Sequence, residues 1–190
     1  MSKILPIIAS PRERRLWILT PVVVVAIYGT LGLAQSLSVA IRGTGLSTIL
    51  FITGCLLVLV AVVTQGLKKR PSGAELGVAI GIVATYLFVF VRMASPFERS
   101  HIVEYGIVSI LVLEALQERR SQGRRVPIPP LLAIAVTSLV GAIDEGIQAV
   151  IPSRVFDVRD IFFNCMAAVM AVASMLALRW VRLKIHSRKD

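Results

Sequence analysis

The sequence predicts an all-helical protein that crosses a membrane several times. The chain of 190 residues is 56% hydrophobic and only 17% charged, and its mean hydropathy is +0.80. Its apolar residues gather in long runs that reach or approach the ~20 residues a helix needs to cross a bilayer. The basic residues lie mainly between these runs. We therefore expect one membrane domain over residues 1–190.

Each predicted span is an apolar run closed by polar residues. The first run follows a short basic leader and is longer than the roughly 7–15 apolar residues of a signal peptide, so we do not expect cleavage. The fourth run is the shortest, and its amphipathic pattern predicts burial among neighbouring helices. The six predicted spans are about 16–34, 46–67, 74–93, 101–116, 128–151 and 160–181.

The distribution of Lys and Arg predicts how the six spans are oriented. Six spans place both termini on one side of the membrane. The leader, the second and fourth connections and the C-terminal tail share that side and hold sixteen of the 21 basic residues, against five elsewhere. Because cytoplasmic loops carry an excess of basic residues, we expect both termini in the cytoplasm.

Several function classes find no support in the sequence. The net charge of +10 follows from the loop bias, and no basic stripe with interleaved aromatics indicates nucleic-acid binding. Cys55 and Cys165 each lie inside an apolar run and are expected to be small buried side chains, not a disulfide or zinc ligands. No Ser-centred elbow, GxGxxG, Walker or HExxH motif is present.

A polar group opens the predicted fourth span. Residues 95–98 are typical of a helix start, with Glu98 in the position of a capping residue. His101 and Glu104 are three residues apart, and Tyr105 follows on the same helical face. A carboxylate beside a histidine fixes the imidazole for acid–base or metal chemistry. The alternative is a polar pair that only docks the fourth helix on the fifth.

A denser polar group joins the fifth and sixth spans. Adjacent carboxylates at membrane depth are costly, so either Asp144 or Glu145 should be held neutral or have a cationic partner, of which Arg154 is the nearest. The alternative is a purely structural ion-pair network. Asp157 fits the N-cap of the sixth helix, and Asn164 is too deep to be a cap and needs an internal partner. The group comprises Asp144, Glu145, Gln148, Arg154, Asp157, Asp160 and Asn164.

Both polar groups fall on the outward side of the predicted topology. Six of the 11 carboxylates lie at or near the outer ends of spans four to six. Because isolated charges in hydrocarbon are costly, we expect these side chains to share a cavity open to the outer face. Such a site could perform acid–base chemistry with His101 and Glu145, hold a divalent cation, or bind a polar head group or an amine. The spacing of the residues does not decide between these activities, and it does not show whether a metal or cofactor is bound.

The two groups together resemble the VanZ-like family of bacterial membrane proteins. The resemblance covers about residues 98–174 and is carried by ERSHIVEY and DEGIQAVIPSRVFDVRDIFFN. The family often has Lys where Arg99 stands. It also often has Gly residues after the Asn that corresponds to Asn164, where this chain continues with Cys165, Met166 and two alanines. The positions that match the family pattern are Arg99, His101, Tyr105, Glu145, Gln148, Pro152, Arg154, Asp160 and Asn164.

The resemblance implies a role in the cell envelope and a place in the bacterial cytoplasmic (inner) membrane. The founder of the family is associated with reduced susceptibility to the glycopeptide teicoplanin. Our first hypothesis is a protein that binds a lipid-linked or amphiphilic envelope ligand at the outer leaflet. The second is an intramembrane acid–base or metal-assisted enzyme acting on such a ligand. A small transporter is a weaker third, because the spans lack Gly/Pro-broken helices in paired positions.

Overall fold

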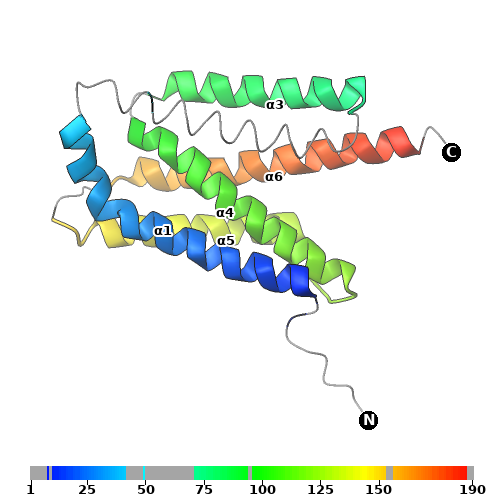
Figure 1. Cartoon of the computed structure of the whole chain (residues 1–190), viewed down its shortest axis with the longest axis horizontal. Coiled ribbons are helices and arrows are strands. Elements are labelled where there is room, and N and C mark those ends of the chain that lie inside the picture. The colour runs from blue at the N-terminus through cyan, green and yellow to red at the C-terminus, as the bar shows by residue number, and fades with distance from the viewer. Residues whose placement is uncertain are drawn as a thin grey trace, which may run out of the picture.

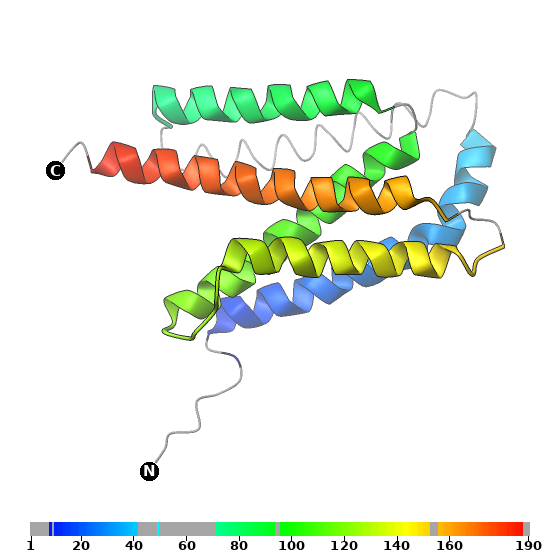
Figure 2. The ribbon, with the colours of Figure 1, turned by 180° about the vertical axis from the view of Figure 1, so that it is seen from behind.

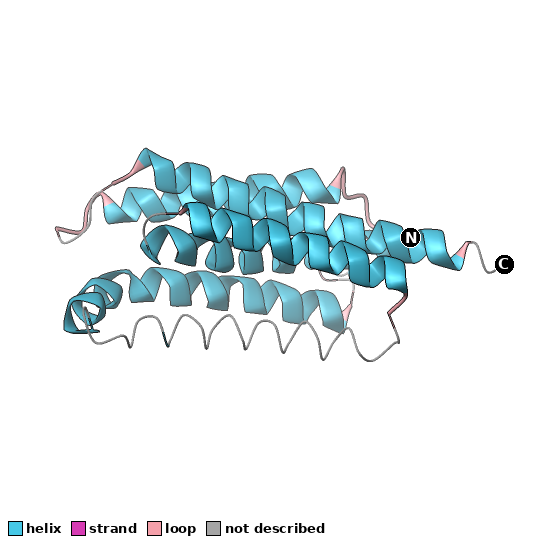
Figure 3. Ribbon diagram, turned by 90° about the horizontal axis from the view of Figure 1, so that it is seen from above, coloured by secondary structure: helices cyan, strands magenta, loops and turns pink. Residues whose placement is uncertain are grey.

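The computed structural model describes residues 10–41, 71–93, 96–152 and 156–187, with the single residues 8 and 49. For residues 30–41, 96–99 and 186 it describes the backbone alone. The described residues are all-helical and contain no strand (Figures 1 and 3). The helices are α1 (Pro11–Ile41), α3 (Gly73–Arg92), α4 (Pro96–Ser121), α5 (Pro129–Gln148) and α6 (Val158–His186).

Four of these helices are long and apolar enough to cross a membrane: α3, α4 from Ser100 onward, α5 and α6. A helix of 20 residues, such as α3 or α5, is about 30 Å long, the thickness of the hydrocarbon core. The prediction of a polytopic helical membrane protein is therefore confirmed. The predicted second span, about 46–67, lies outside the described residues, so the count of six remains a prediction.

The ends of the helices follow local capping signals. Ser72 and Glu75 form a reciprocal capping box at the start of α3. Asp157 is the N-cap of α6, as the sequence predicts, and its Oδ1 atom accepts a hydrogen bond from the Arg159 amide at 2.8 Å. The expected cap at residue 95 lies outside the described residues. Both α1 and α4 are longer than their apolar runs, because their charged ends continue as helix and pair with each other.

Helix α4 forms the centre of the bundle. It packs against α1, α5 and α6, while α3 packs on α6, and it crosses diagonally between the others in Figures 1 and 2. Val108, Val112 and Leu113 of α4 are fully buried, in a core shared with Ile27 and Val172. The expected burial of the fourth span is confirmed, since it has the largest buried share of the four candidate spans. The predicted full burial of Cys165 is wrong: it is only partly buried, because it is turned by about 100° around α6 from the fully buried Asn164. Cys55 lies outside the described residues.

The bundle has two chemically different ends. At one, which we call the basic end, α1 begins, α4 ends, α5 begins and α6 ends; at the other, the site end, α4 begins, α5 ends and α6 begins (Figure 1). Ion pairs connect the helices at the basic end. They are Arg12–Glu114, Arg12–Glu118, Arg119–Glu13, Arg179–Glu114 and Arg182–Glu75.

Candidate functional site

Three helices bring a histidine and two carboxylates together at the site end. His101 comes from the first turns of α4, Glu145 from the last turn of α5, and Asp160 from the first turn of α6. One ring nitrogen of His101 and one carboxylate oxygen from each acid all lie within 4.8 Å of one another. We call these three residues the triad. The sequence places them on the same end of the bundle, and the structure adds that their side chains converge.

Glu145 is held in position by two hydrogen bonds. Its side chain is fully buried. Gln148, one turn later in α5, donates from Nε2 to Glu145 Oε1 at 2.9 Å, and the Asp157 backbone amide donates to Oε2 at 3.3 Å. The same Gln148 nitrogen lies 3.3 Å from Asp144 Oδ2. Because both oxygens are oriented, the carboxylate has little freedom to turn away from the triad.

His101 is buried and packed against an aromatic ring. It is 7% exposed, and its ring stacks on Tyr105 with 5.9 Å between centroids. Its Nε2 atom lies 3.7 Å from Asp160 Oδ2, beyond hydrogen-bond distance. Asp160 keeps 20% of its side chain exposed and therefore lies at the rim of the cluster. A histidine held between carboxylates suits proton transfer, binding of a polar group or binding of a cation.

Gly141 and Asn164 set the separation of α5 and α6 next to the triad. Asn164 is fully buried, and its Nδ2 atom donates to the Gly141 carbonyl at 3.4 Å. This contact supplies the internal partner that the sequence requires for Asn164. A Cβ atom on Gly141 would lie 2.6 Å from Asn164 Cβ. Only glycine permits this approach, so Gly141 is a residue of the site region whose role the sequence alone did not indicate.

The remaining predicted site residues divide into three groups. Asp144 and Tyr105 are buried beside the triad. Glu104 is partly buried and Asp157 is exposed; neither belongs to the triad. The side chains of Arg99 and Arg154 lie outside the described residues, so compensation of Asp144 and Glu145 by Arg154 remains a prediction.

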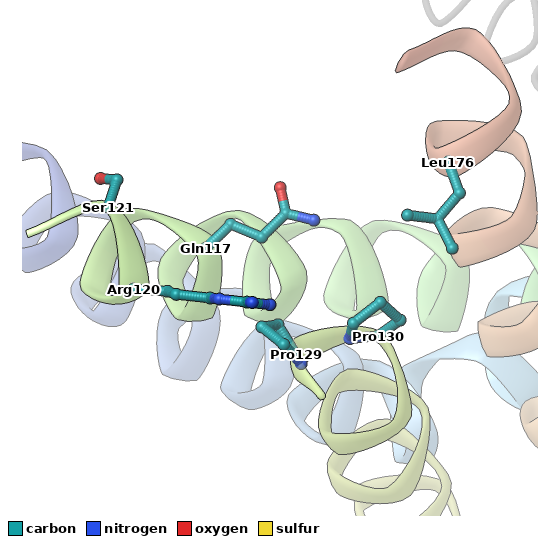
Figure 4. A pocket seen from close by; sticks show the side chains of 6 residues that line it. All are labelled: Gln117, Arg120, Ser121, Pro129, Pro130 and Leu176. Atoms are coloured by element: carbon teal, nitrogen blue, oxygen red, sulfur yellow. The ribbon is translucent and has the colours of Figure 1, made fainter. Parts of the chain in front are cut away.

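A pocket of about 500 Å³ lies at the basic end, far along the bundle from the triad. Figure 4 shows side chains of α4 and the first residues of α5 around it, with Leu176 of α6 across from them. No predicted site residue lines this pocket. This pocket therefore does not test the expected cavity around the predicted residues, which remains a prediction. The lining residues are Gln117, Arg120, Ser121, Pro129, Pro130 and Leu176.

Comparison with known proteins places these features in a family. The family model VanZ/LLP1 matches residues 19–179. This range extends well before the segment 98–174 that carries the resemblance in the sequence, and it includes most of α1 and all of α3, α4 and α5. No curated protein and no solved structure gives a significant match. Since the family model covers most of the sequence, the chain belongs to the VanZ/LLP1 family.

Proposed function

We propose that this membrane protein binds the polar head of a lipid-linked or amphiphilic ligand of the bacterial cell envelope at its site end. The observation that carries the proposal is the convergence of His101, Glu145 and Asp160 from three helices. Buried ionisable groups at a helix end are costly and usually serve a function in membrane proteins. Asp160, on the rim, gives a polar head group access to the cluster.

The proposal includes an orientation for the bundle. Six spans with both termini in the cytoplasm of a bacterial inner membrane put the basic end inside and the site end outside. The position of the basic residues supports this. Arg12 opens α1, Arg119 and Arg120 close α4, and Arg182 lies near the end of α6, all at the basic end. The triad would then meet ligands of the outer leaflet.

The activity that we propose is reduced susceptibility to an envelope antibiotic of the glycopeptide type. Family membership supports the proposal, and teicoplanin is the first compound to test. Cells should carry the wild-type chain, the His101→Gln variant or the Glu145→Gln variant, with the level of inserted protein measured in each. Gln keeps the polar reach of both side chains but cannot be protonated near neutral pH in place of His, nor carry the charge of Glu.

We expect both variants to insert normally and to lose the difference in susceptibility that the wild type confers. Glu118→Gln is the matched control, because it makes the same chemical change at the basic end, where Glu118 pairs with the exposed Arg12. It should behave like the wild type, because the amide oxygen of Gln can still accept the hydrogen bonds that Glu118 Oε1 accepts from Ser10 and Gln122. A stable His101→Gln variant with full activity would contradict the proposed site.

An acid–base enzyme at the same site is the second candidate. It is favoured by the position of His101, whose Nε2 atom lies 3.7 Å from the Asp160 carboxylate and which has a ring nitrogen within 4.8 Å of a Glu145 carboxylate oxygen. A binding protein leaves its ligand chemically unchanged, whereas an enzyme converts it. Mass spectrometry of envelope lipids from cells with wild-type or His101→Gln protein distinguishes the two, because only an enzyme produces a new species that disappears in the variant.

A further inference from the structure

The donor atoms of the triad have the composition of a metal site. One imidazole and two carboxylates match the ligand preferences of zinc and other divalent first-row metals, whereas calcium and magnesium favour oxygen ligands alone. The three donor atoms lie within 4.8 Å of one another. Donors around a tetrahedral zinc ion are about 3.4 Å apart, as follows from bond lengths of about 2.1 Å. Small rotations of the side chains would therefore close the site around an ion.

His101 provides a second and independent observation. A buried imidazole normally satisfies its nitrogens with hydrogen bonds. His101 is 7% exposed, yet its Nδ1 atom has no hydrogen-bond partner among the described residues, and its Nε2 atom is 3.7 Å from Asp160. At this distance the Nε2 atom makes no hydrogen bond with the Asp160 carboxylate. The same arrangement is favourable when a cation lies between the three groups.

Groups around the triad limit the motion of its three side chains. Gln148 and the Asp157 amide fix the two oxygens of Glu145. Tyr105 stacks on the His101 ring and limits its rotation. Asp157 also caps α6, which fixes the first turn that carries Asp160. Each of the three ligands is therefore held by at least one neighbouring group, and Asp157 serves both Glu145 and Asp160.

We propose that His101, Glu145 and Asp160 bind one divalent transition-metal ion, zinc or manganese by donor type. This inference rests on the proposed function, because it assigns a cofactor to the same site. Three protein ligands leave at least one coordination position open. The exposed side of Asp160 is the route by which a phosphate oxygen of a lipid head group would reach that position. The metal would thus supply the positive charge that binds an anionic head group.

The test uses the full chain purified in detergent and freed of metal. ZnCl₂ and MnCl₂ are titrated separately, with bound metal measured by elemental analysis and affinity by calorimetry. We expect the wild type to bind about one ion per chain, as a three-ligand site does. His101→Gln, Glu145→Gln and Asp160→Asn should each bind at least about ten-fold more weakly, since even loss of a supporting group costs 10–100-fold. Co²⁺ should give visible absorption bands that change in His101→Gln.

Two matched controls exclude non-specific binding. His186→Gln removes the other histidine of the chain, and Glu118→Gln removes a carboxylate at the basic end; both should keep wild-type affinity. Asp160→Asn keeps the test valid if a more buried variant fails to fold, because Asp160 is at the rim.

Two results would overturn the metal site. One is a wild type without saturable binding; the other is a His101→Gln or Asp160→Asn variant with unchanged affinity. If Arg154→Gln alone destabilises a protein that binds no metal, an arginine supplies the positive charge and the metal inference is wrong. In that case, a His101→Gln variant that no longer reduces antibiotic susceptibility would still support the proposed function. Failure of the metal inference is therefore distinguishable from failure of the proposed function.

Discussion

Gly141→Ala tests whether the contact between α5 and α6 holds the triad together. The added Cβ would lie 2.6 Å from Asn164 Cβ, 2.9 Å from its Nδ2 atom and 3.0 Å from its Cγ atom. Carbon atoms in favourable contact are about 3.5–4.0 Å apart, so the two helices must separate by roughly 1 Å. The clash involves Cβ, which no side-chain rotation can move.

The magnitude is best judged against a second glycine on the same helix. Gly146 is exposed, and a Cβ there meets nothing within 4 Å. Alanine gains about 1 kcal/mol of helix propensity at either position. The difference in unfolding free energy between the two variants therefore isolates the clash, about 1–3 kcal/mol by analogy with overpacked cores. Loss of the hydrogen bond from Asn164 to the Gly141 carbonyl would add about 1 kcal/mol.

Thermal unfolding in detergent measures this difference. For a chain of this size, 1 kcal/mol shifts the melting temperature by about 2–4 °C, so a loss of about 1–4 kcal/mol should make Gly141→Ala melt about 2–16 °C below Gly146→Ala. The site should also respond, because Glu145 and Asp160 lie one turn from Gly141 and Asn164, respectively. Gly141→Ala should weaken the antibiotic phenotype and metal binding, while Gly146→Ala should leave both intact. If the two variants melt together and keep full activity, the close approach does not position the triad.

Two further predictions concern the orientation of the bundle and the ion pairs at its basic end. Reporter fusions at Gln122 and at Arg42 should lie on opposite sides of the membrane, the first in the cytoplasm, because of the distribution of basic residues; the same side for both would reject the six-span topology. Arg119→Ala removes a partner of the fully buried Glu13 and should cost about 1–3 kcal/mol in thermal unfolding, since a buried acceptor loses its charged donor. Arg12→Ala, whose side chain is 65% exposed, should cost less than about 1 kcal/mol, and equal losses would show that burial of Glu13 does not matter.

Much of the architecture is predictable because membrane spans obey a simple physical rule. The third span is expected at 74–93 and the helix covers Gly73–Arg92, because a bilayer demands a continuous apolar run closed by polar groups. The N-cap role of Asp157 is equally local, since it needs only a side-chain oxygen at the helix start. Consecutive spans run in opposite directions. That alone puts His101, Glu145 and Asp160 at one end of the bundle.

Which of these side chains meet is decided by tertiary packing. Asp144 and Glu145 are neighbours in the sequence, yet Glu145 joins the triad and Asp144 does not. A helix turns by about 100° per residue, so the rotation of α5 about its axis selects one of the two. That rotation depends on surfaces far apart in the chain, such as Gly141 against Asn164. The ion pair between Glu13 and Arg119 likewise cannot be predicted from the number of charged residues at each end. The sequence by itself determines which residues share an end of the bundle, because the bilayer fixes depth; the tertiary structure decides which of them touch, because helix rotation and spacing follow from packing between distant segments.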